Sequence, residues 1–229
     1  MQFSVIIPTY NEAAHIGKLI KQLLDNSNPA DVEVLVVDAG STDGTAEIVS
    51  GTRATLIRAT KKGRSAQMNQ GAQQASGRIL YFVHGDTLPP ESYRSDIEEA
   101  ISMGYQMGCY RFRFDSDKRA LRFNNYMTRF NVLFSRGGDQ SMFISRNDFF
   151  ALGAFREDYI IMEDFEFLVR AKRNRFSFRI IPKDILVSAR KYDNNSYLRV
   201  MSANALVFCM YFLGASQETL CKTYKGLLH

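Results

Sequence analysis

Strand and helix patterns alternate through the first ninety residues, and this alternation constrains the fold more than any other feature. Short apolar runs at 3–8, 32–37, 56–58 and 78–83 indicate four strands, and the segments between them show helical patterns. Asn11 is placed to cap the first of these helices. An alternation of this kind predicts an α/β fold in which helices cover a mostly parallel sheet.

Polar side chains follow three of these strands at their carboxyl ends. They lie at residues 9–12, 38–43 and 84–86. Because the carboxyl ends of parallel strands meet at one edge of a sheet, we expect these segments to lie close together. Open α/β sheets bind their ligands at this edge, so the sequence predicts a ligand site there.

The rest of the chain is less regular, and we expect one domain over residues 1–229, divided into parts at 1–90, 91–190 and 191–229. Its expected strands lie at 108–114 and 141–145, with two edge strands at 180–181 and 185–187 around Pro182. Its expected helices lie at 118–134, after an opening at 162–164, and within 196–227, where two helices are broken near Gly214.

Two aspartates at strand ends are candidates for ligand binding. A carboxylate at Asp38 can accept hydrogen bonds from a nucleobase or a ribose, and it fits equally a turn aspartate that caps the following helix. Asp86 lies two residues after His84 and can hold Mg²⁺ or Mn²⁺. The bare His-x-Asp pattern is more typical of turn chemistry, so this interpretation needs support from elsewhere in the chain.

Three further segments can carry chemistry. One carboxylate of the pair Glu163–Asp164 can take a proton from a hydroxyl, although the pair alone is typical of an acidic helix start. Arg64, in the basic loop 61–64 before a helix, can contact a diphosphate or can simply be exposed. Residues 137–140 can hydrogen-bond sugar hydroxyls or form a plain turn.

The net charge of +5 is concentrated in residues 101–229, which hold 20 Lys/Arg and 12 Asp/Glu. This half can face a phosphorylated acceptor or an anionic membrane, or it can be a solvated surface; no RNA-binding signature supports nucleic acid as a partner. Three cysteines without CxxC spacing suit a reducing cytosol. With no leader pattern and no apolar stretch long enough to span a bilayer, we expect a cytoplasmic protein. Peripheral contact with the inner membrane surface, through the basic second half and the C-terminal helices, is left open.

Two segments together resemble a known family. Val-Ile-Ile-Pro-Thr-Tyr-Asn-Glu at 5–12 and Val-Val-Asp-Ala-Gly-Ser-Thr-Asp-Gly-Thr at 36–45 resemble the first two strand–loop motifs of family 2 glycosyltransferases with the GT-A fold. The resemblance is strong over 3–90, continues through 137–140 and 162–164, and is closest to short transferases with little beyond the core. It implies a Rossmann-like GT-A domain with C-terminal helices that moves a sugar from a nucleotide-diphosphate donor to an acceptor hydroxyl with inversion.

The resemblance also implies roles for individual residues. The nucleotide site would comprise Pro8, Thr9, Asn11, Glu12, Asp38, Gly40, Asp43, Arg64 and Asp86. Within it, Asp38 would hold the base, typically uracil. Asp164 matches the catalytic base of the family's ED motif, with Glu163 beside it. The sugar or acceptor site would comprise Gly138, Asp139 and Gln140.

One departure from the family pattern concerns the metal. Asp86 matches the last aspartate of the DxD motif, which binds a divalent ion and the diphosphate, but His84 replaces the first. Imidazole ligates Mn²⁺ more naturally than Mg²⁺, so Asp86 is the main candidate ligand and His84 the second. The altered motif keeps open a catalytically degenerate nucleotide-sugar-binding module. A sugar nucleotidyltransferase is a further alternative, although the glycine-rich basic loop expected for a triphosphate is missing from the N-terminal segment.

Overall fold

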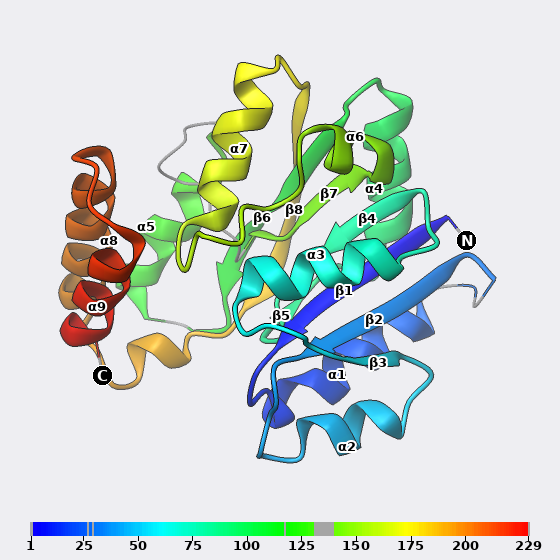
Figure 1. Cartoon of the computed structure of the whole chain (residues 1–229), viewed down its shortest axis with the longest axis horizontal. Coiled ribbons are helices and arrows are strands. Elements are labelled where there is room, and N and C mark those ends of the chain that lie inside the picture. The colour runs from blue at the N-terminus through cyan, green and yellow to red at the C-terminus, as the bar shows by residue number, and fades with distance from the viewer. Residues whose placement is uncertain (1, 27, 29, 117, 131–139, 229) are drawn as a thin grey trace.

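The computed structural model describes residues 2–26, 28, 30–116, 118–130 and 140–228 (Figure 1). The strands are β1 (Phe3–Thr9), β2 (Val32–Asp38), β3 (Thr55–Arg58), β4 (Ile79–Phe82), β5 (Thr87–Leu88), β6 (Met107–Phe114), β7 (Met142–Ser145) and β8 (Phe178–Val187). The helices are α1 (Ala13–Asp25), α2 (Thr45–Ser50), α3 (Arg64–Gln74), α4 (Tyr93–Ser102), α5 (Arg119–Met127), α6 (Arg146–Ala151), α7 (Glu163–Arg173), α8 (Tyr197–Phe212) and α9 (Gln217–Leu227).

The strands described form one sheet in the order β3-β2-β1-β4-β7-β6-β8-β5. The first four strands of this order are parallel to one another, and β6 is parallel to β8. Only β7 and the short β5 run antiparallel to their neighbours. The predicted α/β architecture with a mostly parallel sheet is therefore confirmed.

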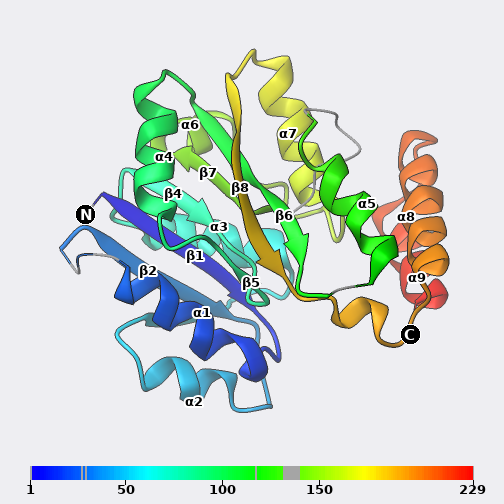
Figure 2. The same ribbon diagram turned by 180° about the vertical axis from the view of Figure 1, so that it is seen from behind.

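Helices cover both faces of the sheet, as opposite views show (Figures 1 and 2). Alternate residues of β1 point to opposite faces, as the pleat of a strand requires. Phe3, Val5 and Ile7 pack in one core cluster with α1 and α4, whereas Ile6 packs in a second cluster with α3, α6 and α7. The near-continuous apolar runs in the sequence thus arise because β1 is buried on both sides.

Helix α3 lies very close to the sheet because it carries Gly71. A Cβ atom at this position would lie 2.5 Å from Cγ2 of Ile6 and 3.2 Å from Cγ2 of Val37. The glycine therefore sets the depth at which α3 packs, and α3 carries Gln67 and Arg64 into the candidate site.

Two expectations for the second half need correction. The edge strands predicted around Pro182 are one strand, β8, which pairs with β6 on both sides of an irregularity at Tyr110/Arg111. The missing N–H of Pro182 is tolerated because Pro182 lies at this irregularity without a paired residue in β6, and β5 pairs only with Leu186 and Val187 on the other side of β8. The helix predicted at 118–134 ends at Met127, and residues 131–134 lie outside the described part of the chain.

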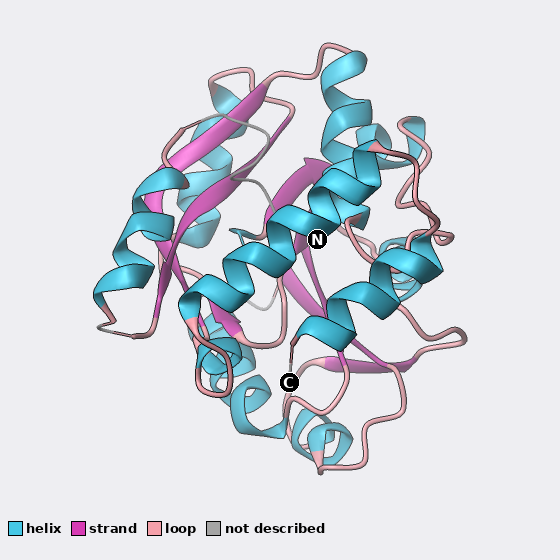
Figure 3. Ribbon diagram, turned by 90° about the vertical axis from the view of Figure 1, so that its left-hand side faces the viewer, coloured by secondary structure: helices cyan, strands magenta, loops and turns pink. Residues whose placement is uncertain are grey.

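The two C-terminal helices form as predicted and are separated at Gly214, which has a φ of 81°. They lie at one end of the molecule, and Figure 3 shows them crossing the face toward the viewer. No helix among the described residues combines the length and the apolar character that crossing a bilayer requires.

Candidate functional site

The loops after β1 and β2 are tied together by side-chain hydrogen bonds. The Asn11 amide oxygen accepts from the Thr42 N–H at 2.9 Å, and the Ser41 hydroxyl accepts from the Asn11 N–H at 2.8 Å. Asn11 has a φ of 57° and does not cap α1, so the predicted cap is wrong. The Asp43 carboxylate caps this helix from the other loop, because it accepts from the Ala13 N–H at 2.9 Å.

Asp43 also shapes its own loop. The Thr45 hydroxyl donates to its carboxylate, and this bond, followed by that from the Ala13 N–H, lowers the pKa of Asp43. The resemblance placed Asp43 in the nucleotide site, either near the ribose or as a support of its loop. These hydrogen bonds match the supporting role, and a contact with a ribose stays a prediction.

The buried Asp38 carboxylate is surrounded by donors from the same loops. One oxygen accepts from the Gly40 and Ser41 N–H groups at 3.0 and 2.9 Å, and the other accepts from the Ser41 and Thr9 hydroxyls. A carboxylate offers about four acceptor sites, and all are engaged here. This conformation matches the turn interpretation of Asp38, and its contact with a base stays a prediction.

A buried glutamine that the sequence patterns did not reveal lies beneath these loops. The Gln67 side-chain amide, on α3, donates to the backbone oxygens of Thr9 and Val37 at 2.9 and 2.7 Å. It joins the ends of β1 and β2 where the sheet opens. Its position in the sequence carried no signal, because polar residues are frequent on helices.

Arg190 joins two of the predicted site carboxylates. Its guanidinium forms a two-pronged ion pair with Glu12, at 2.9 and 2.5 Å, and its Nη2 lies 3.1 Å from Oδ2 of Asp86. These contacts, with the bond to Glu12 the largest cause, raise the pKa of Arg190. Arg190 opens a 3₁₀ turn after β8, and sequence reasoning missed it because its partners lie over a hundred residues away.

A second ion pair joins Arg64 and Glu163. The Arg64 Nε atom, at the start of α3, lies 3.1 Å from Oε1 of Glu163, at the start of α7. The Glu163 carboxylate is 1% exposed, and its oxygens accept no hydrogen bond from the described residues. Arg64 was predicted to bind the nucleotide and Glu163 to lie beside the catalytic base, and in this structure the two side chains form an ion pair with each other.

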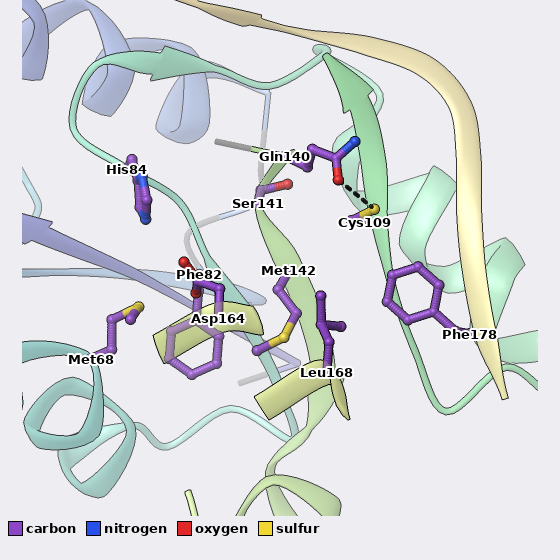
Figure 4. Close-up of a pocket in the computed structure, with 10 residues that line it drawn as sticks. All are labelled: Met68, Phe82, His84, Cys109, Gln140, Ser141, Met142, Asp164, Leu168 and Phe178. Atoms are coloured by element: carbon purple, nitrogen blue, oxygen red, sulfur yellow. Dashed lines mark hydrogen bonds between the residues drawn. The ribbon is translucent and has the colours of Figure 1, made fainter. Parts of the chain in front are cut away.

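Asp164 differs from its neighbour because it lines a small cavity between α7 and the sheet (Figure 4). The cavity of about 20 Å³ has room for roughly one water molecule. His84 and Gln140 also line it, and the Cys109 thiol lies 3.9 Å from the Gln140 side-chain oxygen. The structure thus brings Asp164, His84 and Gln140 together; Gly138 and Asp139 lie outside the described residues.

The side chains fit a metal ion only in part. No cluster of three or more His, Cys, Asp or Glu side chains suited to an ion occurs among the described residues, so a closed site built by this part of the chain is not supported. Asp86 remains a suitable ligand, because Mg²⁺-type sites often use one or two carboxylates and complete the coordination with substrate phosphates. In this conformation the cation beside Asp86 is the Arg190 guanidinium.

A largely parallel sheet with polar loops after β1, β2 and β4, and an acidic helix start beside them, is the architecture of GT-A glycosyltransferases. The chain belongs to glycosyl transferase family 2, whose model matches residues 4–161.

Relatives and solved structures agree with this family. Glycosyltransferase AglE of Haloferax volcanii is 41% identical over 106 residues, covering 43% of this chain and 34% of AglE. A PGL/p-HBAD biosynthesis glycosyltransferase of Mycobacterium bovis is 28% identical over 193 residues, covering 75% of this chain and 70% of that protein. The matched region spans only about a third of the length of relatives such as AglE.

Two solved structures share the fold at low identity. The mannosyltransferase PcManGT of Pyrobaculum calidifontis, in complex with GDP-Man and Mn²⁺, has a TM-score of 0.71 at 19% identity and covers 98% of this chain and 68% of that one. TarS 1-349 of S. aureus, in complex with UDP, has a TM-score of 0.67 at 18% identity, covering 99% and 70%. These likenesses confirm the predicted GT-A fold.

Proposed function

We propose that this protein transfers a glycosyl group from a nucleoside-diphosphate sugar, with UDP as the expected nucleotide, to an acceptor hydroxyl. The observation that carries the proposal is the convergence of Glu12, Asp86 and Arg190 at the carboxyl ends of the parallel strands, beside the interlocked loops of β1 and β2. Relatives whose names state glycosyl transfer, and neighbours whose structures contain UDP or GDP-Man, support the same reaction class.

In this proposal the nucleoside lies over the loops that carry Thr9, Asp38 and Gly40, with the diphosphate near Arg190 and Asp86. Asp86 would hold Mn²⁺ or Mg²⁺ together with the diphosphate oxygens, and the bound ion would offset the negative charge of the leaving group. Arg190 supplies a second positive charge at the same place, from the protein itself.

Asp164 is proposed as the general base. It accepts the proton of the acceptor hydroxyl while the acceptor oxygen bonds to the anomeric carbon and the bond from that carbon to the phosphate oxygen breaks. Attack from the face opposite the leaving group inverts the anomeric centre. The cavity beside Asp164 has room for about one water molecule.

The first test is a thermal-shift panel of UDP, GDP, dTDP and CDP, each with and without Mn²⁺, on the wild type and on Asp86→Ala. A nucleotide at one hundred times its Kd stabilises the fold by about 2.7 kcal/mol, which such a scan resolves. We expect a metal-dependent shift with one nucleotide that is lost in Asp86→Ala. The absence of a thermal shift with every nucleotide would contradict the proposed donor site.

Product analysis separates the remaining alternatives. Release of a nucleoside diphosphate with a glycosylated product supports the transferase, whereas release of pyrophosphate from a triphosphate would identify a sugar nucleotidyltransferase. Tight donor binding without turnover would identify a degenerate binding module. A cytoplasmic location stays a prediction, which fractionation of cells that express the protein would check.

A further inference from the structure

Helix α8 presents an apolar face to solvent. Leu198, Leu206, Phe212 and the adjoining Leu213 are 75%, 45%, 62% and 86% exposed. Their spacing places them on one side of the helix, together with the exposed Ala205 and Cys209 and with one exposed polar residue, Ser202. The stripe runs the length of a 16-residue helix, about 24 Å.

This face is unusual for a surface helix. The opposite face of α8 is apolar too, because Val200, Ala203 and Val207 are buried. Arg199 is the single charged residue in the sequence of the helix. A surface helix normally has polar residues on the side that faces solvent, whereas the exposed polar residues of α8 are only Arg199, Ser202 and Asn204. Exposed apolar patches of this kind mark surfaces that bind something.

The segments around this stripe are strongly basic. Residues 118–130 and 190–228, which contain α5, α8 and α9, hold nine Lys/Arg and two Asp/Glu. Their excess of seven positive charges is larger than the net charge of +5 of the whole chain. The three helices lie at the same end of the molecule (Figure 1). The apolar stripe therefore faces solvent within a cationic field.

We propose that the stripe of α8 docks this protein on an anionic membrane surface. A second copy of the chain would bring the same excess of positive charge to the interface, and like charges would oppose that contact. Anionic lipid headgroups bring the opposite sign, and the acyl boundary beneath them accepts leucine and phenylalanine side chains.

The stripe is coupled to the candidate site by direct packing. Phe165 of α7 packs edge-on against Phe208, Tyr211 and Phe212 of α8, with ring centroids 5.0–6.0 Å apart. The Gln217 side-chain oxygen, at the start of α9, accepts from the Ile160 and Ile161 N–H groups just before α7. Docking through α8 would therefore hold the start of α7, with Asp164, close to the bilayer surface.

The sequence contains no tryptophan, so one introduced tryptophan reports on docking without background. Leu213→Trp would be mixed, without nucleotide, with vesicles of phosphatidylcholine alone or with added phosphatidylglycerol. We expect a blue shift and quenching by brominated lipid with the anionic vesicles only, decreasing as salt is raised. Met103→Trp, at an exposed position on the turn after α4, is the matched control and should not respond.

Cosedimentation with the same vesicles measures how much binding is lost when apolar side chains of the stripe are replaced. Leu206→Ser/Leu213→Ser should lower the partition coefficient at least about tenfold, while Met103→Ser leaves it unchanged. Lys222→Gln/Lys225→Gln should also lower it, whereas Lys21→Gln on α1 should not. A single cooperative thermal transition near the wild-type midpoint in every variant shows that folding is intact. This control needs no nucleotide, so the test is separate from that of the proposed function.

Equal partition of the stripe variants and the wild type would overturn the proposal. A concentration-dependent dimer in vesicle-free solution that the stripe variants abolish would overturn it as well, because the face would then belong to a second copy.

Discussion

At the scale of single residues, the charge on Asp86 is balanced in this structure by a side chain of the protein. The Arg190 guanidinium is about half exposed and contacts both Asp86 and Glu12. In the proposed site, a divalent ion at Asp86 would share this carboxylate with Arg190. We therefore expect Arg190 to lower the affinity of the nucleotide-free protein for the ion.

Substitution Arg190→Gln tests this competition. Removing a half-exposed ion pair should raise the Mn²⁺ affinity of the nucleotide-free protein about two- to fivefold, because exposed pairs contribute up to about 1 kcal/mol. Mn²⁺ titration followed by electron paramagnetic resonance measures it directly. Lys191→Gln, in the same turn and with the same change of charge, is the control. Equal affinities in the two variants would mean that Arg190 does not compete.

Asp164→Asn tests the general base. Turnover should fall about a hundredfold or more, while the nucleotide-dependent thermal shift is retained, because the proton acceptor is lost and the donor loops are untouched. Glu166→Gln is the matched control: it lies on the same helix turn, but its carboxylate pairs with Arg170. Wild-type turnover in Asp164→Asn would reject the assignment.

At the residue scale, the sequence indicated members of the candidate site only where a reactive side chain stands at a recognisable boundary of a strand or loop. Asp38, Asp86 and Asp164 stood out because carboxylates directly follow strand or loop boundaries. Arg190 and Gln67 did not, because their partners are brought to them by sheet order and helix packing. His84 and Asp86 looked like one pair, yet His84 lines the cavity with Asp164 while Asp86 contacts Arg190.

At the scale of elements, the sequence predicted buried strands better than edges and caps. Apolar runs correctly placed β1, β2 and β4 because these strands are buried on both faces. The pattern failed at β8, where Pro182 suggested a break, because a proline is tolerated at an irregularity where the strand leaves that residue unpaired. It failed for the α1 cap because Asp43 reaches that helix from the next loop.

Gly71→Ala tests the close approach of α3 to the sheet. The added methyl would contact Ile6 and Val37 and should destabilise the fold by about 1–3 kcal/mol, despite the better helix propensity of alanine. Gly226→Ala in α9 is the control, because its Cβ would meet open space and should be neutral or stabilising by up to about 1 kcal/mol. Urea unfolding with unchanged m values compares the two, and equal midpoints would contradict the packing argument.

At the scale of the whole molecule, one carboxylate joins three parts of the sheet. Glu33 of β2 accepts hydrogen bonds from the Ser4 hydroxyl of β1 and from Ser76 and Gly77 before β4. Burial tends to raise the pKa of Glu33, but these hydrogen bonds, that of Ser4 foremost, lower it overall from 4.5. The ionised form of the Glu33 carboxylate therefore stabilises the fold at pH values above the unfolded-state pKa. This contribution to the free energy of unfolding is lost as the pH falls through the lower pKa of the folded state.

Glu33→Gln should lower the unfolding free energy at neutral pH by about 1 kcal/mol and should flatten its decline in acid. Thermal or urea unfolding between neutral pH and about pH 3 measures both effects. Glu91→Gln, at an exposed position, provides the comparison. An acid profile of Glu33→Gln that parallels the wild type would exclude this linkage.

The ion pair between Glu12 and Arg190 joins residues that are 178 positions apart. On a ribosome that adds about 5–20 residues per second, roughly 10–35 s separate the synthesis of these two residues. During that time the first strands can already pair, but Glu12 and Asp86 have no arginine between them. The contacts of Arg190 are thus among the last to form during the synthesis of this part of the chain, and a nascent protein shorter than 190 residues has Glu12 and Asp86 without this counterion.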